Sequence, residues 1–275
     1  MAEECFYEKV VEFESRRENS YAGTYVATGH TASPWSPEHQ HAGPPAALLV
    51  HAVEQLAVPN QRALTNQMAF DILAPIPMGA VAVTARIIKS GRLTSLVEAE
   101  LSIPGSEHVI MRLSAWRTRR TDVPVSDRLG AYKTAPKEGA TAMRPAHWGA
   151  GFADAMEWRL VKGTMGAGRA TVWARPRVAF IDEARATGVQ LLLLLADSAS
   201  GVSALADPRH LLFVNTDLSV HLVREPVGEW IWMRAQSFID PDGIGLGNSR
   251  LGDIRGSLGF GNQSLFVAKQ TEVDV

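Results

Sequence analysis

The sequence predicts an α+β fold of two similar halves, each a curved antiparallel sheet wrapped around one long central helix. The chain has 275 residues, of which 46% are hydrophobic and 20% are charged, as in an ordinary globular protein. Each half contains one strongly apolar helical segment, followed by several segments in which apolar residues alternate with period two. In each half a Pro–Gly corner follows the first of these segments. The repeated layout predicts a tandem architecture.

In the first half, an alternating segment marked by glycine predicts a strand over residues 21–29. A helix is predicted over residues 44–57, because Pro44 and Pro45 suit the first turn of a helix, where a missing N–H costs nothing. It should end before Pro59. Its apolar residues have the i, i+3, i+4 spacing of one buried face. They are Leu48, Leu49, Ala52, Val53 and Leu56.

Four strands should follow this helix, with a Pro–Gly corner at residues 74–79 and a turn at Gly91. The predicted strands are 65–73, 81–85, 93–103 and 109–117. Residues 121–149 are rich in Pro, Lys, Gly and Thr, which is typical of a linker. We therefore expect an N-terminal unit over residues 1–120 and a C-terminal unit over residues 150–275.

In the second half, residues 158–173 predict strand structure and residues 188–205 predict a helix. Thr187 and Gln190 have the spacing of a capping box at its start. The run Leu191–Leu195 is apolar on all sides, so this helix should be covered on most of its surface. The strands after it are predicted at 211–223, 230–238, 245–251 and 257–267, with a corner at 225–228. Two such units can pair at their edges into one continuous sheet, which also covers exposed strand edges.

Composition excludes several classes of protein. The formal net charge is −2, and the one basic cluster, Arg117, Arg119 and Arg120, is short, which argues against a nucleic-acid or anionic-membrane partner. Cys5 is the single cysteine, so no internal disulfide and no thiolate-rich zinc site can form. No apolar run reaches the roughly 18 residues of a membrane span, and the acidic N-terminus lacks the apolar core of a secretory signal. We expect a cytoplasmic protein.

Several stretches, in order and spacing, resemble the double-hotdog acyl-CoA thioesterases, the thioesterase II group and its actinobacterial thioesterase-like relatives. They are GPPAALLVHAVE at 43–54, FDILAPIPMG at 70–79, SGR at 90–92, LADS at 195–198, NTDLSVHLVREPVGEW at 215–230 and DIRGSLGFGNQSL at 253–265. The resemblance implies a tandem hotdog fold. It also implies hydrolysis of a fatty acyl thioester of coenzyme A or acyl carrier protein, no cofactor, and a homodimer.

The resemblance also implies a catalytic group of three residues that hold and activate a water molecule. The aspartate of this group corresponds to Asp197 and the glutamine to Gln263. The hydroxyl residue between them corresponds to Asn215 or Thr216, because the register on Asp217 places Asn215 at the family's threonine. Side chains alternate across a strand, so one of the two is expected to face the site.

Thioester hydrolysis needs a polarised carbonyl, an attacking water and a route for its proton. An aspartate beside a leucine-rich helix face should be partly desolvated, which makes it a better base. Gly43 and Gly188 precede or open the two helices, where a substrate carbonyl could approach the backbone closely and be stabilised by N–H groups. These two glycines are the predicted substrate-binding positions. No covalent nucleophile is required.

The sequence gives less support to four other functions. Glu38, His39 and His41 invite a metal site, but their spacing is not that of a helical ligand pair and no second cluster accompanies them, so we expect no metal. The chain lacks a Gly-x-Ser-x-Gly elbow, which argues against a Ser-His-Asp hydrolase. A hotdog hydratase or dehydratase would need an Asp-x-Asn-x-x-His arrangement, which is absent. A non-catalytic protein that binds acyl-CoA or an acyl carrier remains an alternative.

Overall fold

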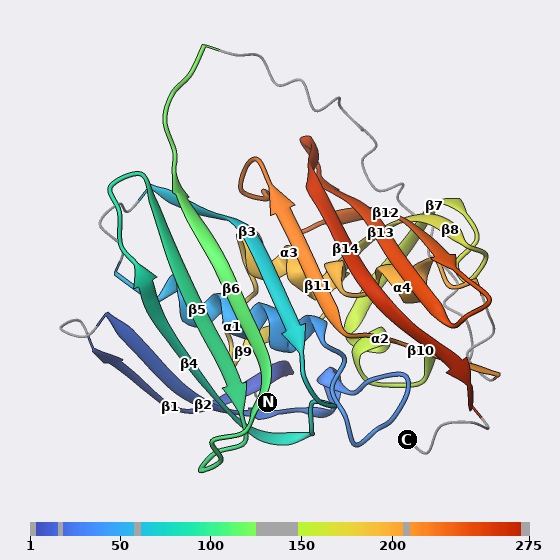
Figure 1. Cartoon of the computed structure of the whole chain (residues 1–275), viewed down its shortest axis with the longest axis horizontal. Coiled ribbons are helices and arrows are strands. Elements are labelled where there is room, and N and C mark those ends of the chain that lie inside the picture. Colours follow the sequence, from blue (N-terminus) through green and yellow to red (C-terminus); the bar gives the residue numbers. More distant parts are fainter. Residues whose placement is uncertain (1–3, 16–18, 58–61, 125–147, 206–209, 271–275) are drawn as a thin grey trace.

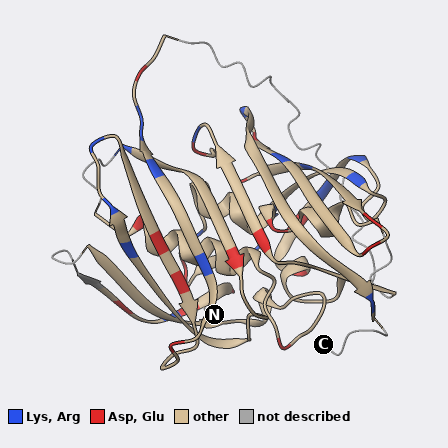
Figure 2. Cartoon of the chain, in the orientation of Figure 1, with Lys and Arg blue, Asp and Glu red and all other residues tan. Residues whose placement is uncertain are grey.

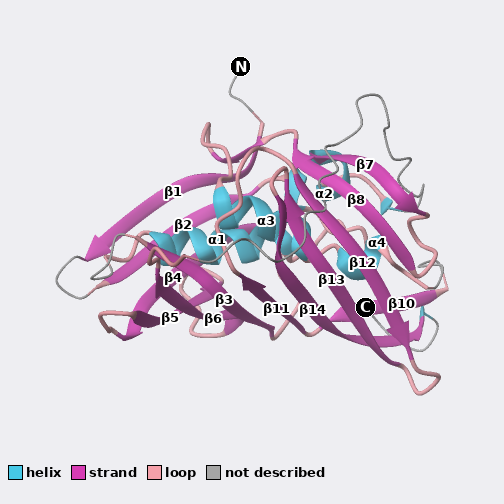
Figure 3. Ribbon diagram, turned by 90° about the horizontal axis from the view of Figure 1, so that it is seen from above, coloured by secondary structure: helices cyan, strands magenta, loops and turns pink. Residues whose placement is uncertain are grey.

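The computed structural model describes residues 4–15, 19–57, 62–124, 148–205 and 210–270. Within these ranges the chain forms one 14-stranded sheet that curves around a small group of helices (Figures 1 and 3). The helices are η1 (Gly29–Thr31), α1 (Gly43–Glu54), α2 (Phe152–Ala155), α3 (Gly188–Ala196) and α4 (Ala199–Val202). None of the helices in the described ranges is long and apolar enough to cross a membrane.

The strands fall into two sets, one from each half of the chain. The first set is β1 (Cys5–Ser15), β2 (Ser20–Ala27), β3 (Ala63–Ile72), β4 (Gly79–Lys89), β5 (Thr94–Ser102) and β6 (Val109–Arg119). The second is β7 (Met156–Gly163), β8 (Arg169–Pro176), β9 (Ala179–Ile181), β10 (Leu211–Asn215), β11 (Asp217–Leu222), β12 (Ile231–Ile239), β13 (Ile244–Asp253) and β14 (Gly256–Lys269).

The strand order is nearly symmetric about the centre of the sheet. From the centre outward it runs β3-β6-β5-β4-β2-β1 on one side and β11-β14-β13-β12-β8-β7 on the other. The two sides join where β3 and β11 pair antiparallel, with Ala69 opposite Ser219. One continuous sheet is therefore confirmed. The short strand β9 belongs to the second half but pairs with β1 in parallel, so the halves also meet at the outer edge.

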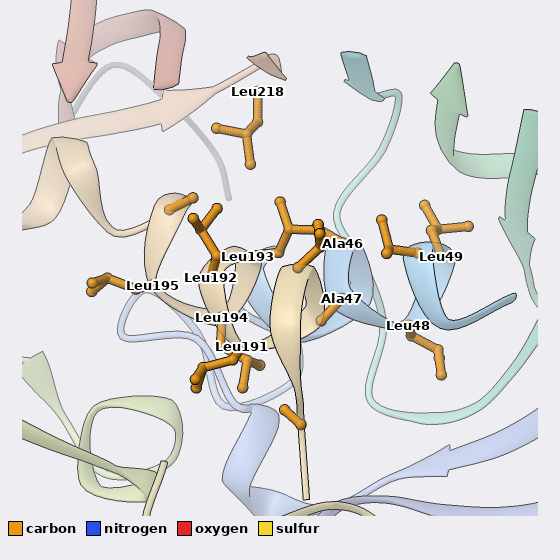
Figure 4. Close-up of a cluster of buried hydrophobic side chains, with 14 of the residues drawn as sticks. Ala46, Ala47, Leu48, Leu49, Leu191, Leu192, Leu193, Leu194, Leu195 and Leu218 are labelled. Atoms are coloured by element: carbon orange, nitrogen blue, oxygen red, sulfur yellow. The ribbon is translucent and has the colours of Figure 1, made fainter. Parts of the chain in front are cut away.

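Helices α1 and α3 lie side by side inside the curve of the sheet (Figures 3 and 4). Helix α1 packs on β2, β4, β5 and β6, and α3 packs on β8, β12 and β13. The helices run in opposite directions. The start of α1 lies against the end of α3, because a Cβ built on Gly43 would be 2.8 Å from the carbonyl oxygen of Leu194. At the other end, Gln190 of α3 bonds Glu54 of α1.

The core follows from the apolar helix faces predicted from the sequence. The five leucines Leu191–Leu195 are at most 3% exposed, and Leu48 and Leu49 are fully buried. Burial of each such side chain stabilises the fold by roughly 1.5–3 kcal/mol before the entropy cost is subtracted. The two helices therefore form the buried centre of the fold, and each end of the pair lies beside a different set of residues.

The second helix is shorter than predicted. The prediction of a helix over 188–205 is wrong, because α3 ends at Ala196 and α4 begins only at Ala199. The Gln263 side-chain amide donates to the backbone carbonyl of Asp197 at 2.8 Å. In a continuing helix that carbonyl would accept a hydrogen bond from the backbone N–H four residues later. The predicted capping box is also wrong, since the Thr187 side chain makes no capping bond and Gln190 donates to Glu54 instead. Helix α1 differs from its prediction only at its ends.

The predicted strand 211–223 is interrupted at Thr216, which separates β10 from β11. Strand β10 pairs with β14 alone, whereas β11 lies between β14 and β3. Strand β1 has no counterpart in the sequence-based prediction. Most of the predicted linker, residues 125–147, lies outside the described residues. Acidic and basic side chains are interspersed along the strands rather than gathered by sign (Figure 2).

Candidate active site

Asp197 is a buried carboxylate at the end of α3, and its Oδ1 accepts two side-chain hydrogen bonds. Its side chain is 4% exposed. Oδ1 accepts hydrogen bonds from the Asn215 amide at 2.8 Å and from the Gln263 amide at 3.0 Å. These two residues come from β10 and β14, so three elements of the second half converge on one oxygen. The bonds to Oδ1 fix the carboxylate and leave Oδ2 to face other groups.

Gln263 is itself held firmly in place. It is 1% exposed, and its Oε1 accepts the backbone N–H of Ser200 at 3.1 Å. Its amide nitrogen donates to both Oδ1 and the backbone carbonyl of Asp197. Gln263 therefore connects the end of α3 to the start of α4. It does not line the cavity described below, so the structure places it behind the carboxylate, where it can orient Asp197 without touching a ligand.

His41 approaches the other carboxylate oxygen from the first half of the chain. Its Nδ1 lies 3.3 Å from Asp197 Oδ2 and 3.1 Å from the backbone nitrogen of Gly43. The imidazole is stacked on Phe152, with ring centroids 4.0 Å apart. Burial lowers the pKa of His41, and the nearby Asp197 charge partly opposes this effect. A protonated Nδ1 donates to Asp197, whereas an unprotonated Nδ1 accepts from Gly43.

A cavity of about 660 Å³ opens beside Asp197 and His41. Its wall is mostly apolar and comes from both halves. The larger apolar side chains that line it are Trp35, Ile72, Leu73, Ile76, Trp148, Phe152, Trp158, Leu212 and Phe213. The carboxylate of Asp197 thus lies between an apolar cavity and the amide donors of Asn215 and Gln263.

Asn215 and Thr216 both line this cavity, but only Asn215 bonds the carboxylate. Thr216 is exposed and makes backbone hydrogen bonds, so the side chain that meets the carboxylate is that of Asn215. The break between β10 and β11 falls at Thr216, and strict alternation of side chains holds only within a continuous strand. The backbone of Thr216 bridges two strands by accepting from Ile72 and donating to Ser264.

The two predicted substrate-binding glycines do not line the cavity. Gly43 lies directly behind it, where its N–H meets His41 and its lack of a side chain lets α1 approach α3. Gly188 lies at the far end of α3 with a φ of +52°, a conformation that favours glycine. The structure brings Gly43 to the site and leaves Gly188 at the opposite end of the helix pair.

The start of α1 offers few backbone donors to a ligand. Pro44 and Pro45 occupy its first turn and have no N–H groups. The N–H of Gly43 meets His41, and the N–H of Ala42 makes no hydrogen bond within the described part of the chain. Ala42 lines the cavity. The unbonded N–H of Ala42, in the turn before α1, is therefore the candidate backbone donor at this end of the helix.

Reasoning from the sequence missed His41 as a partner of Asp197. It appeared there only as one of three residues in a metal hypothesis, and the described residues contain no group of three or more His, Cys, Asp or Glu arranged to bind a metal ion. A signal was available, because His41 stands two residues before a helix start marked by Gly and two prolines. The contact joins residues 156 positions apart (197 − 41), which periodicity cannot reveal.

The geometry supports one kind of chemistry above others. A buried carboxylate with one oxygen held and the other beside a histidine can take a proton from a water molecule. The adjoining apolar cavity can hold an acyl group, and the N–H of the lining residue Ala42 is a candidate donor for a developing oxyanion.

The sequence matches two domain families over most of its length. Residues 31–118 match the acyl-CoA thioesterase N-terminal domain, and residues 135–267 match the acyl-CoA thioesterase C-terminal domain. No curated protein matches the chain.

Solved structures of similar shape cover nearly the whole chain at low identity. An acyl-CoA thioesterase II of Mycobacterium marinum has a TM-score of 0.67 and 17% identity, over 94% of this chain and 97% of that one. A hot dog fold protein of unknown function from Alicyclobacillus acidocaldarius has a TM-score of 0.68 and 14% identity, over 93% and 94%. The tesB protein of Mycobacterium avium subs. paratuberculosis scores 0.65 at 13% identity, over 93% and 95%. At these identities the likeness establishes the hotdog fold.

Proposed function

Because the chain belongs to the acyl-CoA thioesterase family and is a thioester hydrolase, we propose that it hydrolyses a fatty acyl-CoA by direct attack of water, with Asp197 as base. The observation that carries this proposal is the Asp197 carboxylate. It is held by Asn215 and Gln263 and faces a cavity of about 660 Å³. An apolar cavity of this size suits an acyl chain.

In the proposed reaction, Asp197 Oδ2 takes a proton from a water molecule as the water oxygen bonds the thioester carbon. The tetrahedral intermediate then collapses, the carbon–sulfur bond breaks, and the proton passes from Asp197 to the departing thiolate. The products are a fatty acid and free coenzyme A. Asn215 and Gln263 donate to Oδ1 throughout, which keeps Oδ2 aimed at the water.

The oxyanion of the intermediate needs donors that are already in position. The free N–H of Ala42 is the first of these, since Ala42 lines the cavity. The N–H of Gly43 donates to His41 Nδ1, so it can serve the oxyanion only when that hydrogen bond is given up. The contact with His41 thereby controls whether this second donor is available.

The test is release of free thiol from acyl-CoA esters of several chain lengths by the purified full-length protein. We expect Asp197→Asn to lower kcat by about 10²- to 10⁴-fold, the usual contribution of a general base. The control is Asp71→Asn, which neutralises an exposed carboxylate on β3 and should leave kcat unchanged.

Three results would contradict the proposal. One is thiol release that survives Asp197→Asn. Another is hydration of an enoyl-CoA without thiol release, which would indicate a hydratase. The last is saturable binding of acyl-CoA with no turnover, which would indicate a binding protein. Acyl carrier protein thioesters, run in parallel, identify the carrier.

The homodimer and the cytoplasmic location stay predictions. Equilibrium sedimentation at micromolar concentration should give twice the chain mass of 29.8 kDa, and a mass equal to one chain would contradict the dimer.

A further inference from the structure

We propose that the opposite end of the helix pair is a binding site for a phosphate group. A second cavity, of about 320 Å³, lies there between the two halves of the chain. Its polar lining residues are Glu54, Arg62, Thr65, Arg117, Arg120 and Glu225. Nothing in the proposed hydrolysis uses these residues.

The second cavity stands in nearly the symmetric position to the first. The first lies where α1 begins and α3 ends, and the second lies where α1 ends and α3 begins. Strand β6, which carries Arg117, takes the place in the first half that β14 takes in the second. Arg117 also behaves like Gln263, because its Nη1 donates to the helix-end carbonyls of Val53 and Leu56 at 3.1 and 3.2 Å.

Arg117 has a buried donor that is unused in the described part of the chain. Its Nε is shielded from solvent and has no hydrogen-bond partner there. A guanidinium nitrogen of this kind costs free energy unless an acceptor is present. Nε is closed to solvent, so an oxygen of a ligand in the cavity would meet the part of the Arg117 guanidinium that lines the cavity and not Nε itself.

Glu54 faces the same cavity as a carboxyl group that is easily protonated. Burial raises its pKa to about 7, although the Gln190 hydrogen bond and the charge of Arg117 act in the opposite direction. Its Oε2 accepts from Gln190 Nε2 at 2.6 Å. In the protonated form, Glu54 becomes a donor toward a ligand oxygen instead of a competing negative charge.

The charges favour an anion with several oxygens. Three arginines line the cavity; Arg120 is paired with Glu225, and Arg62 lies 4.0 Å from a carboxylate oxygen of Asp122. With Glu54 protonated, the remaining lining residues carry an excess of positive charge and present mostly donors. Guanidinium forks match phosphate oxygens in geometry and charge, and the cavity is large enough for a phosphate monoester.

The experiment is isothermal titration of inorganic phosphate into the full-length protein at pH 7, with Asp197→Asn as background so that no turnover contributes. We expect saturable binding that Arg117→Gln weakens by about 10-fold or more, the value of one charge-assisted hydrogen bond. Arg112→Gln, on the same strand but exposed and paired with Glu100, is the matched control and should bind as the parent does. Arg62→Gln is a second variant, useful if Arg117→Gln is unstable.

Proton uptake tests the role of Glu54 separately. In buffers of different ionisation enthalpy, binding at pH 7 should be accompanied by proton uptake at Glu54 and by any change in the protonation of phosphate itself, and Glu54→Gln should remove the first part and leave the second. Competition by coenzyme A but not by 3′-dephospho-coenzyme A would identify the 3′-phosphate as the source, whereas competition by neither would identify free phosphate. No saturable binding at 10-millimolar levels (about the weakest useful range), or binding that Arg117→Gln and Arg62→Gln leave unchanged, would overturn the proposal.

Discussion

Each end of the α1–α3 pair has a helix terminus, a carboxyl side chain and a cavity, but one cavity is mostly apolar and the other is lined by charged residues. At one end, Asp197 receives two amide hydrogen bonds on one oxygen and borders an apolar cavity. At the other, Glu54 receives one amide bond and shares a polar cavity with three arginines. The comparison teaches that a near-symmetric fold does not impose a symmetric site. The residues at each helix end decide whether the space beside them suits an acyl chain or an anion.

The largest expected difference between the two ends appears when one amide donor is removed at each. Gln263→Met should lower kcat by about 100-fold, because a donor that orients the base is lost at nearly constant volume. Gln190→Met removes the matching donor to Glu54 and should change kcat by less than about twofold, the scatter expected of a change remote from the reacting atoms. Steady-state thiol release measures both. Equal losses would mean that the two ends act together in catalysis.

The second prediction concerns stability and the charge on Glu54. Its pKa is about 7 in the folded chain against an ordinary 4.5, so the native state binds more protons than the unfolded state between these pH values. Stability must therefore fall as the pH rises through that window, and the ionised side chain costs about 3 kcal/mol above it. Glu54→Gln should relieve this cost at pH 8 and have little effect at pH 4.

Urea unfolding at the two pH values measures this difference. The exposed carboxylate of Glu107 provides the control, since Glu107→Gln should not change stability at either pH. A stabilisation by Glu54→Gln that is equal at pH 4 and pH 8 would show that charge is not its cause.

The third prediction compares the two helix-start glycines. A Cβ at residue 43 would meet the Leu194 carbonyl at 2.8 Å, so Gly43→Ala must separate the helices and should cost about 1–3 kcal/mol. It should also lower kcat, because His41 would move. Gly188→Ala should cost about 1 kcal/mol through its positive φ and leave kcat unchanged, since its nearest neighbour is the flexible Glu225 side chain. Loss of activity in Gly188→Ala alone would reverse the assignment of the two ends.

The smallest expected effect is on the pH profile. Burial lowers the pKa of His41, so the ring is neutral at pH 7 and becomes charged only in more acidic solution. Protonated Nδ1 then donates to Asp197 Oδ2 and withdraws the base from water. His41→Asn should therefore keep more of its activity than the wild type as the solution is made acidic, by a few-fold in kcat/KM. A parallel loss of activity in both proteins across this range would exclude His41 from the acid limb.

Much of the architecture is determined locally by the sequence. The leucine run at 191–195 and the apolar face of α1 identify the two helices, because burial of a whole helix face leaves a periodic pattern that neighbours in sequence display together. The alternating strands and their repeated order predict two units that join into one sheet, as the strand order confirms. The stretches that resemble thioesterases predict the acyl-CoA thioesterase family, which the domain matches confirm.

Contacts between distant residues are decided only by the tertiary structure. At the end of α3, the Gln263 amide from β14 donates to the Asp197 carbonyl. The pairing of His41 with Asp197, and the polar cavity around Arg117 at the opposite helix ends, bring together side chains from both halves. Periodicity reports which side of an element is buried. It carries no information on which distant polar group meets a buried one, because that choice is made by the packing of the whole sheet around the helix pair.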